Sequence, residues 1–199
     1  MRTRNPSGCA VTAFSGGNLE GLAASIFSYE PELVPGLLQT RDYANAVLGI
    51  ERMGPDELEK RVDLRLEREK VLRRRFPLTF GVILNEAVLC RVVGSPEVMA
   101  RQLAHLVYAM DWPNVSVRVL PFSAGAHRAM LNGFSYLRFH ERTEPDVIYI
   151  ETRTGAAYLD KPRERQSYRD AMRDLSELAL CQDESRALIA ARAREFADD

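Results

Sequence analysis

A proline-framed corner near residue 35 constrains the fold of this chain more than any other stretch. The run from Glu30 to Ala44 reads Glu-Pro-Glu-Leu-Val-Pro-Gly-Leu-Leu-Gln-Thr-Arg-Asp-Tyr-Ala. Proline fixes its own φ angle and biases the preceding residue toward an extended conformation. After Gly36, apolar residues recur at helical intervals: Leu37, Leu38, Tyr43, Ala44 and Val47. We therefore expect an extended segment that enters a tight turn and continues as a helix.

This run resembles the effector domain that follows an XRE-type helix-turn-helix in a large actinobacterial group of antitoxin-like transcriptional regulators. The resemblance covers roughly residues 20 to 190, because further matching segments follow in the family's order. They are Asn85–Leu89, Val93-Gly94, Met99 with Gln102-Leu103, Val115–Pro121, Gly125–His127, Gly133-Phe134 and Tyr149–Glu151. The resemblance implies a protein partner, often a small protein encoded beside it, and a role in development or specialised metabolism.

The chain departs from this family at its start. Members normally carry a helix-turn-helix before the domain, whereas here only the first 18 or so residues precede it. Residues 1–18 are rich in Ser, Gly, Thr and Asn and show no periodic apolar face, which predicts a flexible lead rather than a DNA-binding domain. Residues 19–199 are expected to form one domain. A smaller departure is Arg68-Glu69, where the family usually has Arg-Gln.

Composition argues against several functional classes. A formal net charge of -1 gives no electrostatic reason for a polyanion partner, so we expect no direct DNA binding. Three distant cysteines and three scattered histidines give no disulfide framework and no metal-ligand spacing. No apolar run is long enough to span a bilayer, and the N-terminus lacks a signal-type apolar core, so the expected location is the cytoplasm.

The order of predicted elements indicates an α+β fold. Helices are expected from Pro55 to about residue 75, after Ser95 to Met110, and twice near the C-terminus, while residues 24–29, 78–84, 115–120, 134–139 and 147–151 read as strands. Short turns between the later strands favour antiparallel pairing. We expect a mainly antiparallel twisted sheet of about four or five strands, covered by helices, with a loop from Arg153 to Pro162.

The loop from Pro121 to Arg128 is the best candidate for a site in the sequence. It follows a strand, contains small residues that allow a ligand near the backbone, and carries His127 and Arg128. Histidine exchanges protons near neutral pH. The alternative is that His127 anchors the loop through backbone hydrogen bonds, and the sequence favours this slightly.

Two glutamates in apolar surroundings extend this candidate site. Glu86 lies where a strand becomes a helix, and Glu151 lies at the end of a strand. If the fold brings them near His127, burial would raise their pKa values and prepare them for proton transfer. Glu86 also suits a structural role at its own corner, and the sequence favours that role. The ligand-binding residues expected from the matched segments and this loop are Gln39, Tyr43, Phe122, His127, Arg128, Phe134 and Tyr149.

Two functions follow as hypotheses. The first is a non-enzymatic effector domain that binds a small molecule or a protein partner without its own DNA-binding part. The second is a cofactor-free enzyme of cyclase or isomerase type, recruited to a biosynthetic pathway, with His127, Glu151 and Glu86 as catalytic residues. The chain carries no phosphate loop, nucleophile elbow or zinc-binding motif, and no cofactor is expected. Whether its apolar helix faces form a homodimer stays open.

Overall fold

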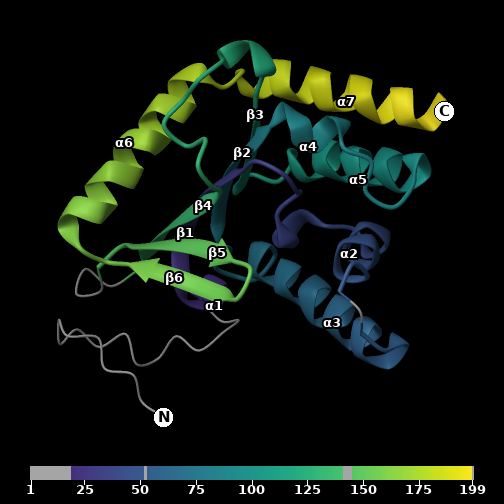
Figure 1. Cartoon of the computed structure of the whole chain (residues 1–199), viewed down its shortest axis with the longest axis horizontal. Coiled ribbons are helices and arrows are strands. Elements are labelled where there is room, and N and C mark those ends of the chain that lie inside the picture. Colours follow the sequence, from purple (N-terminus) through teal and green to yellow (C-terminus); the bar gives the residue numbers. More distant parts are fainter. Residues whose placement is uncertain (1–18, 52, 141–144, 199) are drawn as a thin grey trace.

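Six strands of the chain form one sheet, with helices on both sides (Figure 1). The computed structural model describes residues 19–51, 53–140 and 145–198, so the expected lead at residues 1–18 lies outside the described residues. The strands are β1 (Ala23–Glu30), β2 (Thr79–Asn85), β3 (Val115–Leu120), β4 (Phe134–Phe139), β5 (Val147–Thr152) and β6 (Gly155–Leu159). The α-helices are α1 (Leu19–Leu22), α2 (Arg41–Leu48), α3 (Pro55–Arg68), α4 (Glu86–Cys90), α5 (Pro96–Ala109), α6 (Pro162–Leu178) and α7 (Gln182–Asp198). Short 3-10 helices are η1 (Gly36–Leu38), η2 (Glu69–Leu72) and η3 (Phe122–Ala124).

The sheet is mixed, in the order β3-β2-β1-β4-β5-β6. Strand β1 pairs in parallel with β2, and β2 pairs in parallel with β3, while β4, β5 and β6 continue the sheet antiparallel. The expectation of four or five mainly antiparallel strands is therefore wrong. The chain between β1 and β2 contains α2 and α3, and the chain between β2 and β3 contains α4 and α5. Each of these long connections returns the chain to the end of the sheet where the previous strand began, so the first three strands run parallel. The α+β class itself is confirmed.

Strand β6 is the element that the sequence did not predict. The segment read as a loop pairs with β5 in a hairpin, with Thr152 opposite Gly155. Its sequence, Gly-Ala-Ala-Tyr-Leu, has only two large side chains and no alternating apolar pattern. Strand β6 is stabilised mainly by its pairing with β5, and the residue pattern of one strand alone does not predict such pairing.

Local signals explain where the main helices begin. Thr40 caps α2 by accepting a hydrogen bond from the Tyr43 backbone N–H, and Ser95 caps α5 in the same way through Val98. Pro55 and Pro96 occupy the first turns of α3 and α5, where the missing N–H costs nothing. The corner expected near residue 35 is η1, which leads directly into α2.

The two faces of the sheet pack against different helices. On one face, Ile26, Phe80 and Leu137 join Met99 and Leu103 of α5 in the larger core, together with parts of α2 and α7. On the other face, the smaller core packs α6 onto the strands, and its members include Tyr29, Ile83, Phe134, Ile148, Ala171 and Leu175. Helix α6 stands apart from the α2–α5 group in Figure 1. In the described part of the chain, no helix is both long and apolar enough to cross a membrane.

Candidate functional site

A cavity of about 400 Å³ lies on the larger-core face of the sheet, beside the corner at residue 35. Its apolar wall consists of Ile26, Leu33, Val34, Pro35, Leu37, Val47, Phe80 and Leu137. Its polar wall consists of Glu20, Ser28, Glu30, Gly36, Gln39, Arg65, Arg68, Ser135, Tyr149, Glu151 and Tyr158. We call it the Glu30 cavity. Strands β1, β2, β4, β5 and β6 all contribute to it, so the sheet forms its floor.

The Pro-Gly-Leu-Leu-Gln corner forms one rim of the Glu30 cavity. Gln39 ends η1 and is only 5% exposed. Its Nε2 donates a hydrogen bond to the Val34 carbonyl at 2.7 Å, and its Oε1 accepts one from Arg65 Nη1 at 3.0 Å. A buried amide with both ends bonded has one orientation, so Gln39 fixes the corner and directs the Arg65 side chain of α3.

Two buried residues behind the corner hold it in place. The hydroxyl of Tyr43 accepts a hydrogen bond from the Val34 backbone N–H at 3.2 Å. Gln102 of α5 is fully buried, accepts from the Thr40 N–H and donates to the Leu38 carbonyl, both at 2.7 Å. Polar backbone groups of an irregular segment need such partners when water is excluded. Tyr43 and Gln102 therefore support the rim from outside the cavity.

Two arginines of α3 line the cavity opposite the sheet. Arg68 donates two hydrogen bonds to the carboxylate of Glu20, with Nε to Oε2 at 2.8 Å, so its charge is paired. Arg65 bonds the neutral amide of Gln39 instead, and burial lowers the pKa of its guanidinium. A Cβ added to Gly36 would meet the Arg68 guanidinium at 3.8 Å and the Arg65 Cδ at 3.9 Å, both ordinary contact distances. The backbone of the corner thus lies directly against the arginine pair.

Glu30, the last residue of β1, is the strongest electrostatic feature of the cavity. Burial, followed by repulsion from Glu151, raises its pKa from 4.5 to about 8. The Glu30 carboxyl is therefore mostly neutral at pH 7. Burial and the nearby Glu151 also raise the pKa of Tyr149. A group that both donates and accepts protons near neutral pH thus faces a cavity with one polar and one apolar wall.

The structure separates the residues that the sequence grouped together. Gln39, Tyr149 and Glu151 line the Glu30 cavity. His127 lies on the opposite face, where its Nε2 is 3.4 Å from the hydroxyl oxygen of Tyr29, a residue of the smaller core. The Ala129 N–H donates to His127 Nδ1 at 3.3 Å. His127 thus makes the local loop contacts that the sequence analysis gave as its alternative role.

The other predicted residues also lie outside the cavity. Glu86 accepts a hydrogen bond from the Phe122 backbone N–H at 2.8 Å and lies 3.7 Å from Arg192, so it holds its corner to the loop and to α7. Phe122 itself is exposed. Phe134 packs edge-on against Tyr168, and Arg128 pairs with Asp174 of α6 at 2.8 Å.

Sequence reasoning missed the most informative residues of the cavity, Glu30, Arg65, Arg68 and Tyr158. Glu30 enters the sequence analysis only as part of the corner, although an acid at the end of an apolar strand and before a proline indicates a carboxyl close to the core. The acidic residues that alternate with Arg65 and Arg68 along α3 are typical of a solvated helix face, yet both arginines line the cavity. No pattern in a single strand predicts that Tyr158 reaches the same cavity.

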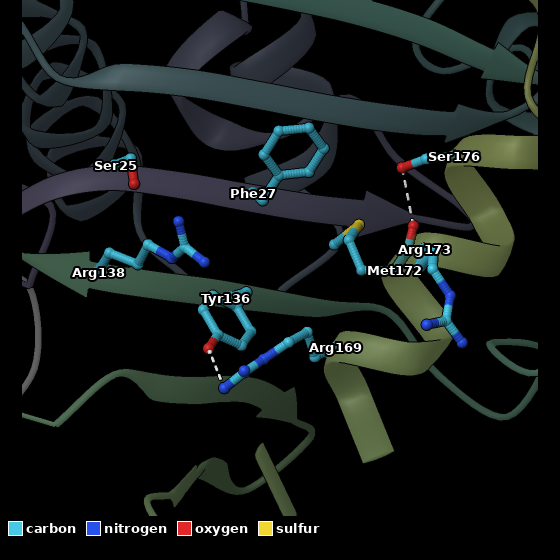
Figure 2. A pocket seen from close by; sticks show the side chains of 8 residues that line it. All are labelled: Ser25, Phe27, Tyr136, Arg138, Arg169, Met172, Arg173 and Ser176. Carbon is cyan, nitrogen blue, oxygen red and sulfur yellow. Dashed lines mark hydrogen bonds between the residues drawn. The ribbon is translucent and has the colours of Figure 1, made fainter. Parts of the chain in front are cut away.

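A second, smaller cavity of about 240 Å³ lies on the opposite face, between α6 and strands β1 and β4 (Figure 2). Figure 2 shows Phe27 and Met172 above Tyr136, with Arg138 and Arg169 beside it. The Tyr136 hydroxyl donates to Asp146 at 2.6 Å and accepts from Arg169 at 3.3 Å. The Tyr136 hydroxyl thus already has two partners, and the arginines of the cavity, Arg138, Arg169 and Arg173, are exposed. We call it the Met172 groove.

A metal centre has no support in the described part of the chain, where no three His, Cys, Asp or Glu side chains gather closely enough to hold an ion. The family model for a domain of unknown function, DUF5753, matches residues 17–191. The chain belongs to the DUF5753 family. No curated protein and no solved structure matches it. The matched range of DUF5753 includes every residue of the Glu30 cavity and every strand of the sheet.

Proposed function

We propose that this DUF5753 domain is a non-enzymatic effector domain that binds a small molecule in the Glu30 cavity. The carrying observation is the Glu30 carboxyl itself, which faces a cavity of about 400 Å³ and has no hydrogen-bond or ion-pair partner among the residues that the structure describes. Partly buried polar groups in proteins are normally paired, and exceptions concentrate at functional sites. An apolar pocket with a few convergent polar groups is the usual form of a small-molecule site.

The wider role follows from the resemblance to effector domains of actinobacterial XRE-type regulators. We propose that ligand binding in this domain is the signal-receiving step of such regulation, in specialised metabolism or development, with a small protein partner as the alternative occupant. The corner supports this view, because its hydrogen bonds connect the cavity rim to α5 through Gln102. A ligand that reorders the rim would therefore act on the helices of the larger core. The proposal includes no direct DNA contact by this domain.

A ligand search on the purified chain tests the proposal. Small-molecule extracts of the source cells are screened by thermal shift, because binding to the folded state alone raises apparent stability. The stabilising compound is then identified by mass spectrometry. The expected result is a compound that is recovered unchanged, and whose effect disappears in Val47→Phe and Leu33→Trp, which fill the cavity from two half-buried positions.

The control for this search is Met172→Phe in the Met172 groove, on the other face of the sheet. It should bind the compound as the wild type does. A compound that stabilises both blocked variants as much as the wild type contradicts the proposal, provided that circular dichroism shows all variants folded.

A second candidate function is a cofactor-free enzyme of cyclase or isomerase type, and one observation favours it. The Glu30 cavity contains a carboxylic acid with a pKa of about 8 beside the exposed carboxyl of Glu151 and the phenol of Tyr149. A neutral acid and a carboxylate in one pocket form a general acid–base pair. A compound that is recovered converted would decide for this function. Conversion should then fail in Glu30→Gln and Glu151→Gln while the fold persists.

A further inference from the structure

The Glu30 cavity has more acidic than basic side chains in its lining. Glu20, Glu30 and Glu151 face Arg65 and Arg68, so the lining carries one more acid than it carries guanidinium groups. Glu20 and Arg68 neutralise each other through two hydrogen bonds. Arg65 and Glu151 are opposite charges within electrostatic range, although no ion pair joins them. Glu30 is the acid left over: the lining is neutral while Glu30 is protonated, and a single added cation balances the lining once Glu30 loses its proton.

The shape and chemistry around Glu30 also suit a cation. The ring centroids of Tyr149 and Tyr158 lie 5.4 Å apart, on the same wall of the cavity as Glu151. Aromatic faces attract ammonium groups. Ser28 and Ser135, bonded to each other at 2.7 Å, add hydroxyl oxygens to the floor. The apolar wall, which includes Ile26, Leu33 and Phe80, completes the cavity. A ligand that satisfies this lining therefore carries one ammonium group on a compact apolar body.

We propose that the Glu30 cavity binds small apolar molecules that carry a primary or secondary amine, with the ammonium group between the carboxyls of Glu30 and Glu151. This inference rests on the proposed function, since it names the ligand class of the same site. It assigns to Glu30 the ion pair that the described residues do not give it. The opposite ligand class, an anion at Arg65, would leave two carboxyls unpaired and is disfavoured by their repulsion.

Ligand binding is then coupled to release of a proton. With the cavity empty, Glu30 is largely protonated at neutral pH, because burial and Glu151 raise its pKa to about 8. The amine arrives already protonated, the ion pair favours the Glu30 carboxylate, and the Glu30 proton leaves to the solvent. The other groups that face or influence Glu30 are Glu20, Arg65, Arg68, Tyr43, Tyr149, Glu151 and Tyr158. Among them Glu151 is the acid whose charge opposes Glu30 ionisation.

Isothermal titration calorimetry with matched probe series tests this inference. The probes are phenethylamine, cyclohexylmethylamine and hexylamine, each compared with the alcohol and the carboxylate of similar size. Titrations at neutral pH in phosphate and in Tris give the number of protons released, because the two buffers differ in ionisation heat. We expect amines to bind at least about tenfold more tightly than their alcohols. Each bound amine should release about one proton.

Variants make the result specific to Glu30. Glu30→Gln should weaken amine binding at least about tenfold and abolish the buffer dependence, while leaving alcohol binding unchanged. The matched control is Glu32→Gln, because Glu32 is exposed, pairs with Arg91 and lies outside the cavity lining. This control should bind amines and release protons as the wild type does.

The outcomes separate the ligand class from the proposed function. No binding by any amine, equal or tighter binding of the alcohols or carboxylates, or amine binding without proton release overturns the inference. The proposed function survives that result if the extract screen yields a neutral or anionic compound whose effect the Val47→Phe variant removes. Both fall together only if the extract screen also yields no compound that depends on the cavity.

Discussion

Arg65 of α3 donates a hydrogen bond to Gln39 at 3.0 Å, and this contact joins the corner after β1 to the helix that closes the Glu30 cavity. The same amide donates to the Val34 carbonyl at 2.7 Å. Both the nitrogen and the oxygen of the Gln39 amide are thus hydrogen-bonded, and the side chain is buried. The corner, the arginine wall and the acid at the end of β1 consequently form one structural unit.

Replacing Gln39 should destabilise this unit measurably. Gln39→Leu leaves the Val34 carbonyl without its hydrogen-bond donor and Arg65 without its only side-chain acceptor among the described residues. We expect a loss of about 1–3 kcal/mol in the free energy of unfolding, the usual cost of a buried polar group left unsatisfied. Urea unfolding measures it. The control is Gln166→Leu, because Gln166 is exposed and its side chain bonds Asp170 on the surface. A loss no larger than that of the control would contradict the buried role of Gln39.

Stability should depend on pH through Glu30. Its pKa is about 8 in the folded state against 4.5 in the unfolded chain, so the folded state holds this proton more tightly. The stabilisation by this group is complete below about pH 4.5 and is lost as pH rises toward 8. In that window the wild type should lose up to about 1.4 kcal/mol per pH unit relative to Glu30→Gln. Urea unfolding of both proteins at several pH values tests this, and parallel stability curves would contradict it.

The C-terminal end of α6 depends on a charged side chain from the sheet. Arg118 of β3 donates to the carbonyls of Leu180, Ser176 and Ala179 at 2.8, 3.0 and 2.6 Å. A cation there also opposes the negative end of the helix dipole. Arg118→Met should lower the free energy of unfolding by about 2–3 kcal/mol. Arg163→Met, at an exposed position of the same helix, is the control, and equal effects of both changes would count against this role.

Histidine at position 127 should be irrelevant to ligand binding in the Glu30 cavity. It contacts Tyr29 on the opposite face of the sheet, and burial lowers the pKa of its imidazole. His127→Ala should change the dissociation constant of a cavity ligand less than about twofold, as expected for a site without shared contacts. Glu151→Gln should weaken the same ligand several-fold. A large effect at His127 with none at Glu151 would return the site to the loop at residues 121–128.

The sequence predicted most elements but not their pairing. Caps and prolines at Ser95, Pro96 and Pro55 gave the starts of two helices, because those signals act within a few residues. The parallel pairing of β1 with β2 depends on how two intervening helices pack, and no local pattern contains that information. The hairpin partner β6 was missed for the same reason.

The sequence predicted some residues of the Glu30 cavity but not the most important one. Gln39, Tyr149 and Glu151 came from segments that matched a family, and the fold brings them to one cavity. The sequence analysis groups Glu151 with His127 because both lie at or after the end of a strand. Side chains of successive strand residues point to opposite faces of a sheet, however, and in the fold Glu151 and His127 lie on different faces. Glu30 was not selected because its raised pKa depends on burial and on Glu151, which only the folded chain brings near it.

The most direct test of the account is a crystal structure of the chain with the compound captured from its own extracts. The account predicts electron density for that compound between the corner at residues 34–39 and strands β1 and β5, with a polar atom within about 3 Å of the Glu30 carboxyl. A compound that sits in the Met172 groove or on the outer surface, with the Glu30 cavity unchanged, would contradict it.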